Sequence, residues 1–283
     1  MILVRGAVVI ALLAACGSKS VPVAPTGAGS ASAKLPDGPP LLTPRETMSY
    51  RLELGGMDLA TYDFGIGDVT EIAGRRAIVV QSHAKSRGLA AVLTNVDDVF
   101  TSWIDVETGR PVRWTVEEST SEGNVRERTD ARFSERAEDA VPVDVWLDDN
   151  EVKTIPQKVS MPDVWDYNAF LIEMRAWEAP RGTTVSSEVF RSRYMWNVTM
   201  TVAGKEKLVT ELGDFPTLRF DGRAYRLERD GTRSKDAEER QFSIWITDDQ
   251  GRVPVQTVGR TDYGDIKLSI TDYQPGNGER IRP

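Results

Sequence analysis

The chain has 283 residues and a formal net charge of −8 at pH 7. That length allows a substantial hydrophobic core, either in one large domain or in two small ones. The acidic balance argues against binding to nucleic acid and against electrostatic attachment to anionic lipid head groups. With a single cysteine the chain cannot form an intrachain disulfide, so the fold must depend on packing alone.

Residues 1–15 have the composition of a signal peptide. Arg5 supplies a positive charge, and residues 6–15 form an uninterrupted run of apolar or small side chains. The run fits the ~7–15 residues of a signal-peptide apolar region and is shorter than the ~20 residues that span a bilayer as a helix. Residues 13–16, Leu-Ala-Ala-Cys, resemble the lipobox of bacterial lipoproteins. The resemblance implies cleavage before Cys16 and acylation of this cysteine, which would anchor the protein to a membrane.

The residue after the cysteine bears on which membrane receives the protein. In Gram-negative lipoproteins an Asp at this position favours retention at the inner membrane, whereas this chain has Gly17. The resemblance therefore implies an outer-membrane lipoprotein with its domain in the periplasm. The inner membrane and the cell surface remain alternatives. Several acyl chains anchor a protein stably, while one chain binds only marginally.

A tether is predicted to follow the anchor. Residues 16–44 consist mostly of Gly, Ser, Ala, Pro, Val and Thr. This composition cannot bury enough surface to offset the entropy lost on ordering, so we expect the segment to be disordered. The folded domain is expected over residues 45–274, and residues 275–283, rich in Gly and Pro, are expected to fray.

The body of the chain has a hydrophobic period of two. Residues 48–54 and 59–66 alternate apolar and polar side chains on either side of a Gly-Gly turn. Similar runs separated by turn residues continue through both halves of the chain. This pattern predicts an all-β, antiparallel domain, built as a strongly curved or barrel-like sheet.

One segment breaks this period. In residues 163–178 the apolar side chains recur at helical spacing, which predicts a single short helix near the middle of the chain. Asp163, directly after Pro162, is the expected N-cap. The strands on either side form either two β halves joined around the helix or one continuous sheet. We expect the helix to lie as a lid or plug across one open end.

Three aromatic residues of this segment are the candidate ligand-binding residues. Trp165, Phe170 and Trp177 lie on one predicted helical face. They belong either to the core of a large sheet or to an aromatic-lined groove for a lipid, glycan or peptide.

The best-defined motif lies near the C-terminus. Trp245, Asp248, Asp249, Arg252 and Pro254 surround a predicted hairpin turn. The Asp side chains can accept hydrogen bonds from turn N–H groups, and Pro254 requires an edge or bulge position. This hairpin resembles the signature of the bacterial exported family catalogued as domain of unknown function 3108. The resemblance implies an all-β exported domain without an established activity.

The same resemblance extends along most of the chain, over roughly residues 46–273. Glu46 and Tyr50 match an opening strand, and Asp166 and Arg175 match an Asp and an Arg beside an aromatic helix. The chain departs from the family pattern in a long charged loop at residues 228–240.

The sequence offers few residues for catalysis, and we predict no cofactor and no metal. The only histidine, His83, lies in an alternating strand, where a structural role is favoured over that of a ligand or base. There is no Gly-x-Ser-x-Gly elbow and no phosphate-binding loop. The acidic pairs stand beside turn signals, which favours turn chemistry over a hydrolytic pair of carboxylates. These pairs are Asp97-Asp98, Asp148-Asp149 and Asp248-Asp249.

Together these observations predict a non-enzymatic, lipid-anchored envelope protein that binds or scaffolds something. In one version it carries a hydrophobic ligand, such as a lipid, or a lipoprotein, with Trp165, Phe170 and Trp177 at the binding site. In a second version it is an assembly protein that pairs an exposed strand edge with another envelope protein. A glycan or cell-wall hydrolase is the less favoured third version.

Overall fold

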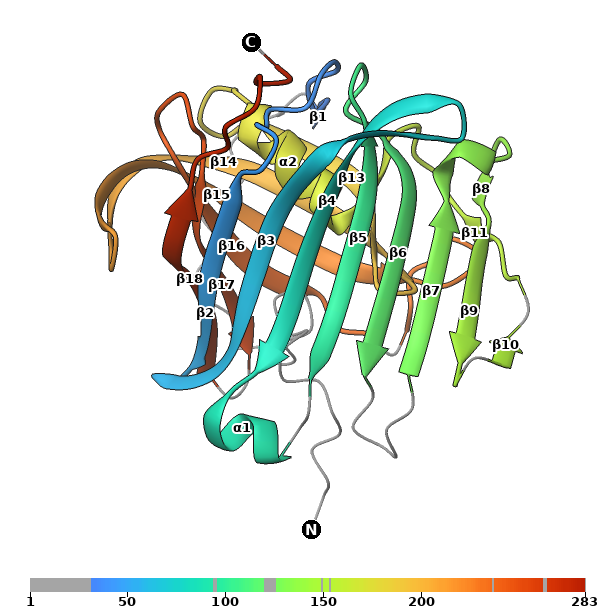
Figure 1. The fold of residues 1–283 in the computed structure, drawn as a ribbon, viewed down its shortest axis with the longest axis horizontal. Coiled ribbons are helices and arrows are strands. Elements are labelled where there is room, and N and C mark those ends of the chain that lie inside the picture. Colours follow the sequence, from blue (N-terminus) through green and yellow to red (C-terminus); the bar gives the residue numbers. More distant parts are fainter. Residues whose placement is uncertain are drawn as a thin grey trace.

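The computed structural model describes residues 32–93, 96–119, 126–148, 150–152, 154–235, 237–261 and 264–282. The predicted signal peptide, Cys16 and most of the predicted tether lie outside these residues. The described residues form one large, strongly curved sheet, which confirms the prediction of an antiparallel all-β fold (Figure 1). The sheet is continuous rather than divided into two β units.

The sheet has two halves that follow each other in sequence. The first half contains β2 (Thr47–Leu54), β3 (Met57–Ile72), β4 (Arg75–Ser86), β5 (Asp97–Asp105), β6 (Pro111–Ser119), β7 (Arg126–Arg132), β9 (Val143–Leu147) and β10 (Asn150–Val152). The second half contains β13 (Thr184–Arg191), β14 (Tyr194–Thr210), β15 (Gly213–Leu227), β16 (Arg240–Thr247), β17 (Pro254–Thr261) and β18 (Gly264–Gln274). Pairing of β18 with β2 joins the halves.

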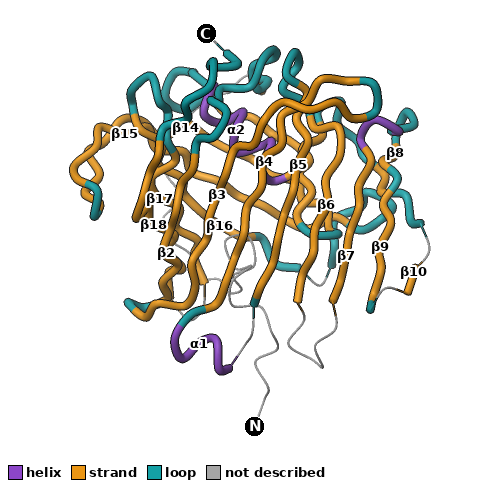
Figure 2. Tube along the Cα trace, in the orientation of Figure 1, coloured by secondary structure: helices purple, strands orange, loops and turns teal. Residues whose placement is uncertain are grey.

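Short elements complete the fold. β1 (Ser32–Ala33) and β12 (Val164–Asp166) each pair in parallel with β13, and β8 (Ala140–Val141) pairs with β11 (Gln157–Lys158). The helices are α1 (Gly88–Leu93), the 3-10 turn η1 (Phe133–Glu135) and α2 (Tyr167–Ala176). Figure 2 shows that α2 is surrounded by strands, whereas α1 lies at one end of the sheet.

The alternating sequence pattern explains how the core forms. In β6, Val112, Trp114 and Val116 are buried, while Arg113 and Thr115 between them are partly exposed. Successive side chains of a strand point to opposite faces, so each strand contributes every second residue to the concave side. The curvature then brings the concave faces of the two halves together around one core.

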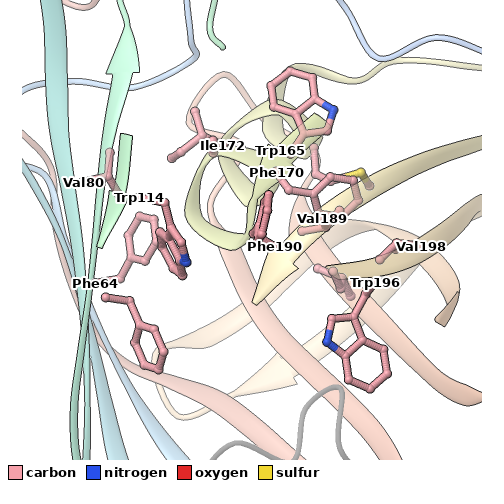
Figure 3. Close-up of a cluster of buried hydrophobic side chains, with 14 of the residues drawn as sticks. Phe64, Val80, Trp114, Trp165, Phe170, Ile172, Val189, Phe190, Trp196 and Val198 are labelled. Atoms are coloured by element: carbon pink, nitrogen blue, oxygen red, sulfur yellow. The ribbon is translucent and has the colours of Figure 1, made fainter. Parts of the chain in front are cut away.

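Large side chains fill the space between the two halves. Figure 3 shows Phe64, Val80 and Trp114 on the wall formed by the first half, opposite Phe190 and Trp196 on β13 and β14. The Trp114 indole N–H donates to the Ser192 carbonyl at 3.3 Å, so the halves also touch through a hydrogen bond. The helix α2 lies between these walls and buries much of its own surface.

The helix is shorter than the sequence predicts and begins later. Residues 163–178 were expected to be helical with Asp163 as N-cap, but α2 starts at Tyr167 and its N-cap is Asp166. The preceding residues are extended because Val164, Trp165 and Asp166 pair in register with β13. A strand pairing far away in sequence therefore overrides the local helical spacing.

Both ends of the predicted domain differ from the prediction. Leu35 and Leu42 are buried in the core, although the tether was expected to continue to residue 44. Ile281 donates its N–H to the Leu42 carbonyl at 3.0 Å, so the tail packs on this same segment rather than fraying. The tether was predicted from the average composition of the segment, which is low in apolar residues. The few leucines in it nevertheless supply apolar area that can be buried. Among the described residues, no helix is long and apolar enough to cross a membrane.

These end segments cover a carboxyl group on α2. Glu173 is fully buried, and neither of its oxygens accepts a hydrogen bond. Gly109 must remain glycine here, because its φ is +71° and an added Cβ would lie 2.3 Å from Glu173 Oε1. Burial raises the pKa of Glu173 to about 8, although Arg282 and Arg110 nearby oppose the rise. The raised pKa favours the protonated form of the side chain in the folded protein, although Arg282 Nη2 lies 3.9 Å from Glu173 Oε2.

This burial predicts a pH dependence of stability. Folded Glu173 keeps its proton up to about pH 8, whereas in the unfolded chain its pKa returns to 4.5. The free energy of unfolding should therefore fall between these two pH values, because the ionised form is disfavoured only in the folded state. Glu173→Gln keeps the shape without ionising, so it should flatten this slope and stabilise the protein at pH 8.5 by on the order of 1–3 kcal/mol.

Urea unfolding at pH 5 and pH 8.5 measures the effect. Glu178→Gln is the matched control, because Glu178 lies just past α2 and is exposed. Equal pH slopes for wild type and Glu173→Gln would contradict the assignment of the protonated carboxyl.

Candidate functional site

The N-terminus of α2 is fixed to the first half of the sheet by buried polar side chains. Asp166 Oδ1 accepts hydrogen bonds from Ala169 N at 2.9 Å and from Ser102 Oγ at 2.7 Å. Asn168 accepts from Ser82 Oγ at 3.0 Å and also donates to carbonyls of β4 and β5. Burial raises the pKa of Asp166 to about 7. These bonds set the position of the first turn of α2 against β4 and β5.

The C-terminus of α2 is held by two arginines that cap each other's backbone. Arg175 donates from Nε to the Arg252 carbonyl at 3.0 Å and from Nη2 to the Gly251 carbonyl at 2.8 Å. In return, Arg252 donates from Nε to the Arg175 carbonyl at 2.8 Å and from Nη2 to the Trp177 carbonyl at 2.7 Å. The last carbonyls of a helix have no partner within the helix, so a cation placed there both bonds and stabilises them.

A carboxylate balances part of this positive charge. Glu46 accepts from Arg175 Nη1 at 3.0 Å and from Nη2 at 2.7 Å, in a two-point ion pair. Tyr273 donates to Glu46 Oε1 at 3.2 Å. The side chains of Arg175 and Glu46 are only 3% and 2% exposed, so water does not screen the pair. We call Glu46, Arg175 and Arg252 the clasp, because they fasten α2 to β2 and to the β16–β17 turn.

The β16–β17 turn is shaped so that Arg252 points into the protein. Asp249 Oδ1 accepts from Thr247 Oγ1 at 2.8 Å, from Gly251 N at 2.9 Å and from Arg252 N at 3.0 Å. Arg252 has a φ of +49°, in the left-handed region, and these bonds hold it there. The Pro254 carbonyl accepts from the Tyr50 hydroxyl at 2.8 Å, which ties the returning strand to β2.

The other side of the same turn holds a projecting hairpin. We call residues 205–216 the arm: they form the outer part of the β14–β15 hairpin, beyond the pairing with β13 and β16 (Figure 1). At its base Lys205 Nζ pairs with Asp248 Oδ2 at 2.6 Å, and Glu206 accepts from the Trp245 indole. Near its tip Glu211 pairs with an arginine of β2, Arg51.

The motif residues therefore divide among three tasks. Trp245 and Asp248 bind the arm, Asp249 shapes the turn, and Arg252 binds the end of α2. The turn is thus a junction between the interior helix and the outermost hairpin of the sheet. The sequence indicated the turn chemistry but gave no sign of the contacts with α2 or with the arm.

A small cavity lies on one side of α2. It measures about 20 Å³, and its lining includes Tyr50, Tyr62, Tyr167, Leu171 and Arg175. A cavity needs roughly 10–15 Å³ of such volume to hold one water molecule, so this space is of the size of a water and not of a lipid. Sequence reasoning missed this face of α2 because the apolar spacing pointed to the opposite side of the helix.

The three predicted ligand-binding residues lie in the core and do not line this cavity. Trp165, Phe170 and Trp177 are buried. The Arg110 guanidinium lies 4.3 Å from the centre of the Trp165 ring, and Trp177 stacks on Phe220 with ring centres 5.4 Å apart. Figure 3 shows Phe170 between the two walls of the core.

Of the residues weighed for catalysis, His83 and Asp97 contact each other, whereas Asp148 and the pair Asp248-Asp249 lie in other turns of the sheet. His83 Nε2 lies 2.6 Å from Asp97 Oδ1, on partly exposed side chains of β4 and β5. The neighbouring Asp98 points to the opposite face of β5, where burial raises its pKa to about 7. Of the pair Asp148-Asp149, the second residue lies outside the described residues. Within the described part of the chain, no three His, Cys, Asp or Glu side chains are grouped as metal ligands would be.

The architecture identifies the class of the protein, which is a β-barrel-like sheet that encloses the helix α2. With a TM-score of 0.55 and 9% sequence identity, it is similar to the crystal structure of a beta-barrel-like protein of the domain of unknown function DUF1849 from Brucella abortus. The likeness covers 84% of this chain and 100% of that one. The hypothetical lipoprotein YmcC from Escherichia coli matches with a TM-score of 0.31 and 12% identity, over 82% of this chain and 86% of that one.

The family follows from the sequence. The model of the family described as "protein of unknown function (DUF3108)" matches residues 48–271, which is most of the chain. The protein belongs to the DUF3108 family, and the predicted resemblance is confirmed. No protein among the curated proteins matches it.

The clasp should contribute strongly to stability. Arg175→Met would leave Glu46 as a buried carboxylate without its partner, so we expect the free energy of unfolding to fall by ~3–5 kcal/mol. Arg252→Met should have a comparable effect, since it removes both donors to the end of α2. Urea unfolding followed by tryptophan fluorescence measures both.

A surface ion pair provides the control for this prediction. Lys205→Met breaks the pair with Asp248, but the Lys205 side chain is 71% exposed and should contribute less than ~1 kcal/mol. The role assigned to the clasp would be wrong if Arg175→Met cost no more than this control.

Proposed function

We propose that the protein is a lipid-anchored, non-enzymatic interaction protein of the bacterial envelope that acts through its outer surface. The observation that carries this proposal is the clasp, which locks α2 between the two halves of the sheet. A helix held in this way is a structural part of the domain rather than a movable lid.

The clasp also makes the role of a lipid carrier less favoured than that of an interaction protein. Pockets for small organic ligands measure roughly 300–1,000 Å³, far more than the cavity of about 20 Å³ beside α2. To admit a lipid there, α2 would have to leave its place. That movement would break the buried ion pair of Arg175 with Glu46 and the bonds from Arg252.

The arm is the element that we propose makes contact with another surface. Its Val209 side chain is 70% exposed and Leu212 is 42% exposed, near the tip of the hairpin. Large apolar side chains at the end of a projecting hairpin suit contact with a surface outside the molecule. Trp245 and Asp248 contact the base of the arm, and Glu211 near its tip pairs with Arg51 of β2.

The location is proposed from the sequence. The lipobox at residues 13–16 would place an acyl anchor on Cys16, and Gly17 favours the outer membrane, with the domain facing the periplasm. An anchored domain meets only the surfaces within reach of its tether, which suits a role in contact or assembly at the envelope.

Cross-linking in intact cells tests the contact surface. A photoreactive amino acid at Val209 should form adducts when the cells are illuminated, because the arm touches another surface. Ile155 is the matched control, since it is also apolar and exposed but lies on the far segment between β10 and β11. Adducts from Ile155 as abundant as those from Val209, or none from Val209, would overturn the role of the arm.

The carrier version and our proposal predict different effects for the aromatic residues. Trp165→Ser should lower the free energy of unfolding by ~3–5 kcal/mol, because Trp165 is fully buried core. Trp103→Ser, at a partly exposed tryptophan of β5, should cost much less. Thermal unfolding by circular dichroism compares the two. A Trp165→Ser variant as stable as wild type that has lost a bound lipid would favour the carrier.

A further inference from the structure

The place where the tether enters the domain is next to the root of the arm. Ser32, the first described residue after the predicted anchor, pairs with Thr184 of β13. Thr184 in turn pairs with Thr201 of β14. The three residues lie in one row across neighbouring strands, which are ~4.8 Å apart. The arm begins at Lys205, four residues beyond Thr201 along β14.

The strand directions place the tether and the arm beyond the same end of β13. β1 runs parallel to β13, so Ser32, the end of β1 nearer to Cys16 in sequence, lies at the start of β13. β14 runs antiparallel to β13, so the arm leaves past that same end. The bulge between Val202 and Gly204 lies where the arm departs from the sheet.

The lengths of tether and arm are comparable. Fifteen residues separate Cys16 from Ser32, and a segment of this length and composition has a reach of roughly 19–23 Å. From Lys205 to Glu211 the arm is about 20 Å long measured along the chain, at ~3.3 Å per residue, and it curves so that Glu211 pairs with Arg51 of β2 (Figure 1). The arm, whose root lies beside Ser32, therefore stays within the reach of the tether from the surface in which Cys16 would be anchored.

The chemistry of the tip suits lipid more than an electrostatic partner. The charged residues of the arm are already paired: Lys205 with Asp248, Lys207 with Asp214, and Glu211 with Arg51. Val209 and Leu212 remain as exposed apolar groups. A net charge of −8 for the whole chain also argues against attraction to anionic head groups.

We infer that the tip of the arm, with Val209 and Leu212, rests on the lipid surface of the membrane that anchors Cys16 and so orients the domain. This inference depends on the proposed function. Two side chains would recruit a free protein only weakly, but the tether holds the tip at a high local concentration near the bilayer. The two attachments together would fix which face of the sheet points away from the membrane.

A strand of another protein, paired with the edge of the arm, is less favoured than the lipid surface as its partner. A new strand would align along the outer part of β14, beside Lys205 and Lys207, whose side chains are 71% and 67% exposed. Lysines on an exposed strand are a common device against edge-to-edge pairing. A second copy of the chain, paired about Lys207, would also bring two lysines together.

Site-specific fluorescence on the full acylated chain tests the inference. Cys16 is the only cysteine, and acylation blocks its sulfur, so a second cysteine can be labelled alone. An environment-sensitive dye is attached to Val209→Cys, Leu212→Cys or the control Glu138→Cys. Glu138 is exposed and lies close to β8, at the opposite end of the long axis from the arm (Figure 1). The proteins are reconstituted in vesicles of phosphatidylethanolamine with a minor share of phosphatidylglycerol.

The inference predicts a blue shift and several-fold lower quenching by iodide at 209 and 212 than at 138. Adding Leu212→Asp to the Val209→Cys protein should abolish that protection while the thermal unfolding curve stays unchanged. Dyes at 209 and 212 as accessible as at 138 would overturn the inference. Protection seen in native envelopes but not in pure lipid would assign the tip to a protein partner, overturning the lipid contact and leaving the proposed function intact. Absence of acyl mass on Cys16 would overturn both.

Discussion

The buried guanidinium of Arg175 is the constraint on which the rest of the structure depends. A charge removed from water must be matched by a carboxylate and by carbonyl groups at bonding distance. Glu46 and the carbonyls of the β16–β17 turn supply these partners, and they come from opposite ends of the chain. The charge can be accommodated only if β2, α2 and the β16–β17 turn meet at one place. The continuous sheet between β16 and β2 holds them there.

The same turn gives the outer surface its shape. Arg252 faces inward to α2, while Trp245 and Asp248 support the arm on the outside. Contact with α2 and contact with the arm are both made by one short segment, so the five motif residues lie within ten positions. A rigid interior and a projecting hairpin are thus features of one junction. This arrangement favours contact by the surface over uptake into the interior, in keeping with the lipid-anchored role proposed above.

The strands were predictable because their period of two records burial on one face, as β6 shows. The turn of the motif was also readable, since Asp and Gly have strong local preferences there. The place of Trp165, Phe170 and Trp177 in the core could not be predicted, because a periodic apolar face has the same sequence pattern whether it contacts a ligand or the core. The start of α2 was misplaced because pairing of β12 with β13 is invisible to local pattern. The contacts of Arg252 join residues 75 and 77 positions apart, and one sequence carries no trace of such distances.

Native-state hydrogen exchange of α2 tests the central claim most directly. If the clasp makes α2 part of the core, the amides of Leu171 to Arg175 should exchange only through global unfolding. Their opening free energy should then equal that of the whole domain and should fall with added urea along the global slope. Exchange of these amides through a smaller opening, independent of urea while β4 and β5 stay protected, would show that α2 moves as a lid. That result would contradict the account and return the interior to consideration as a binding site.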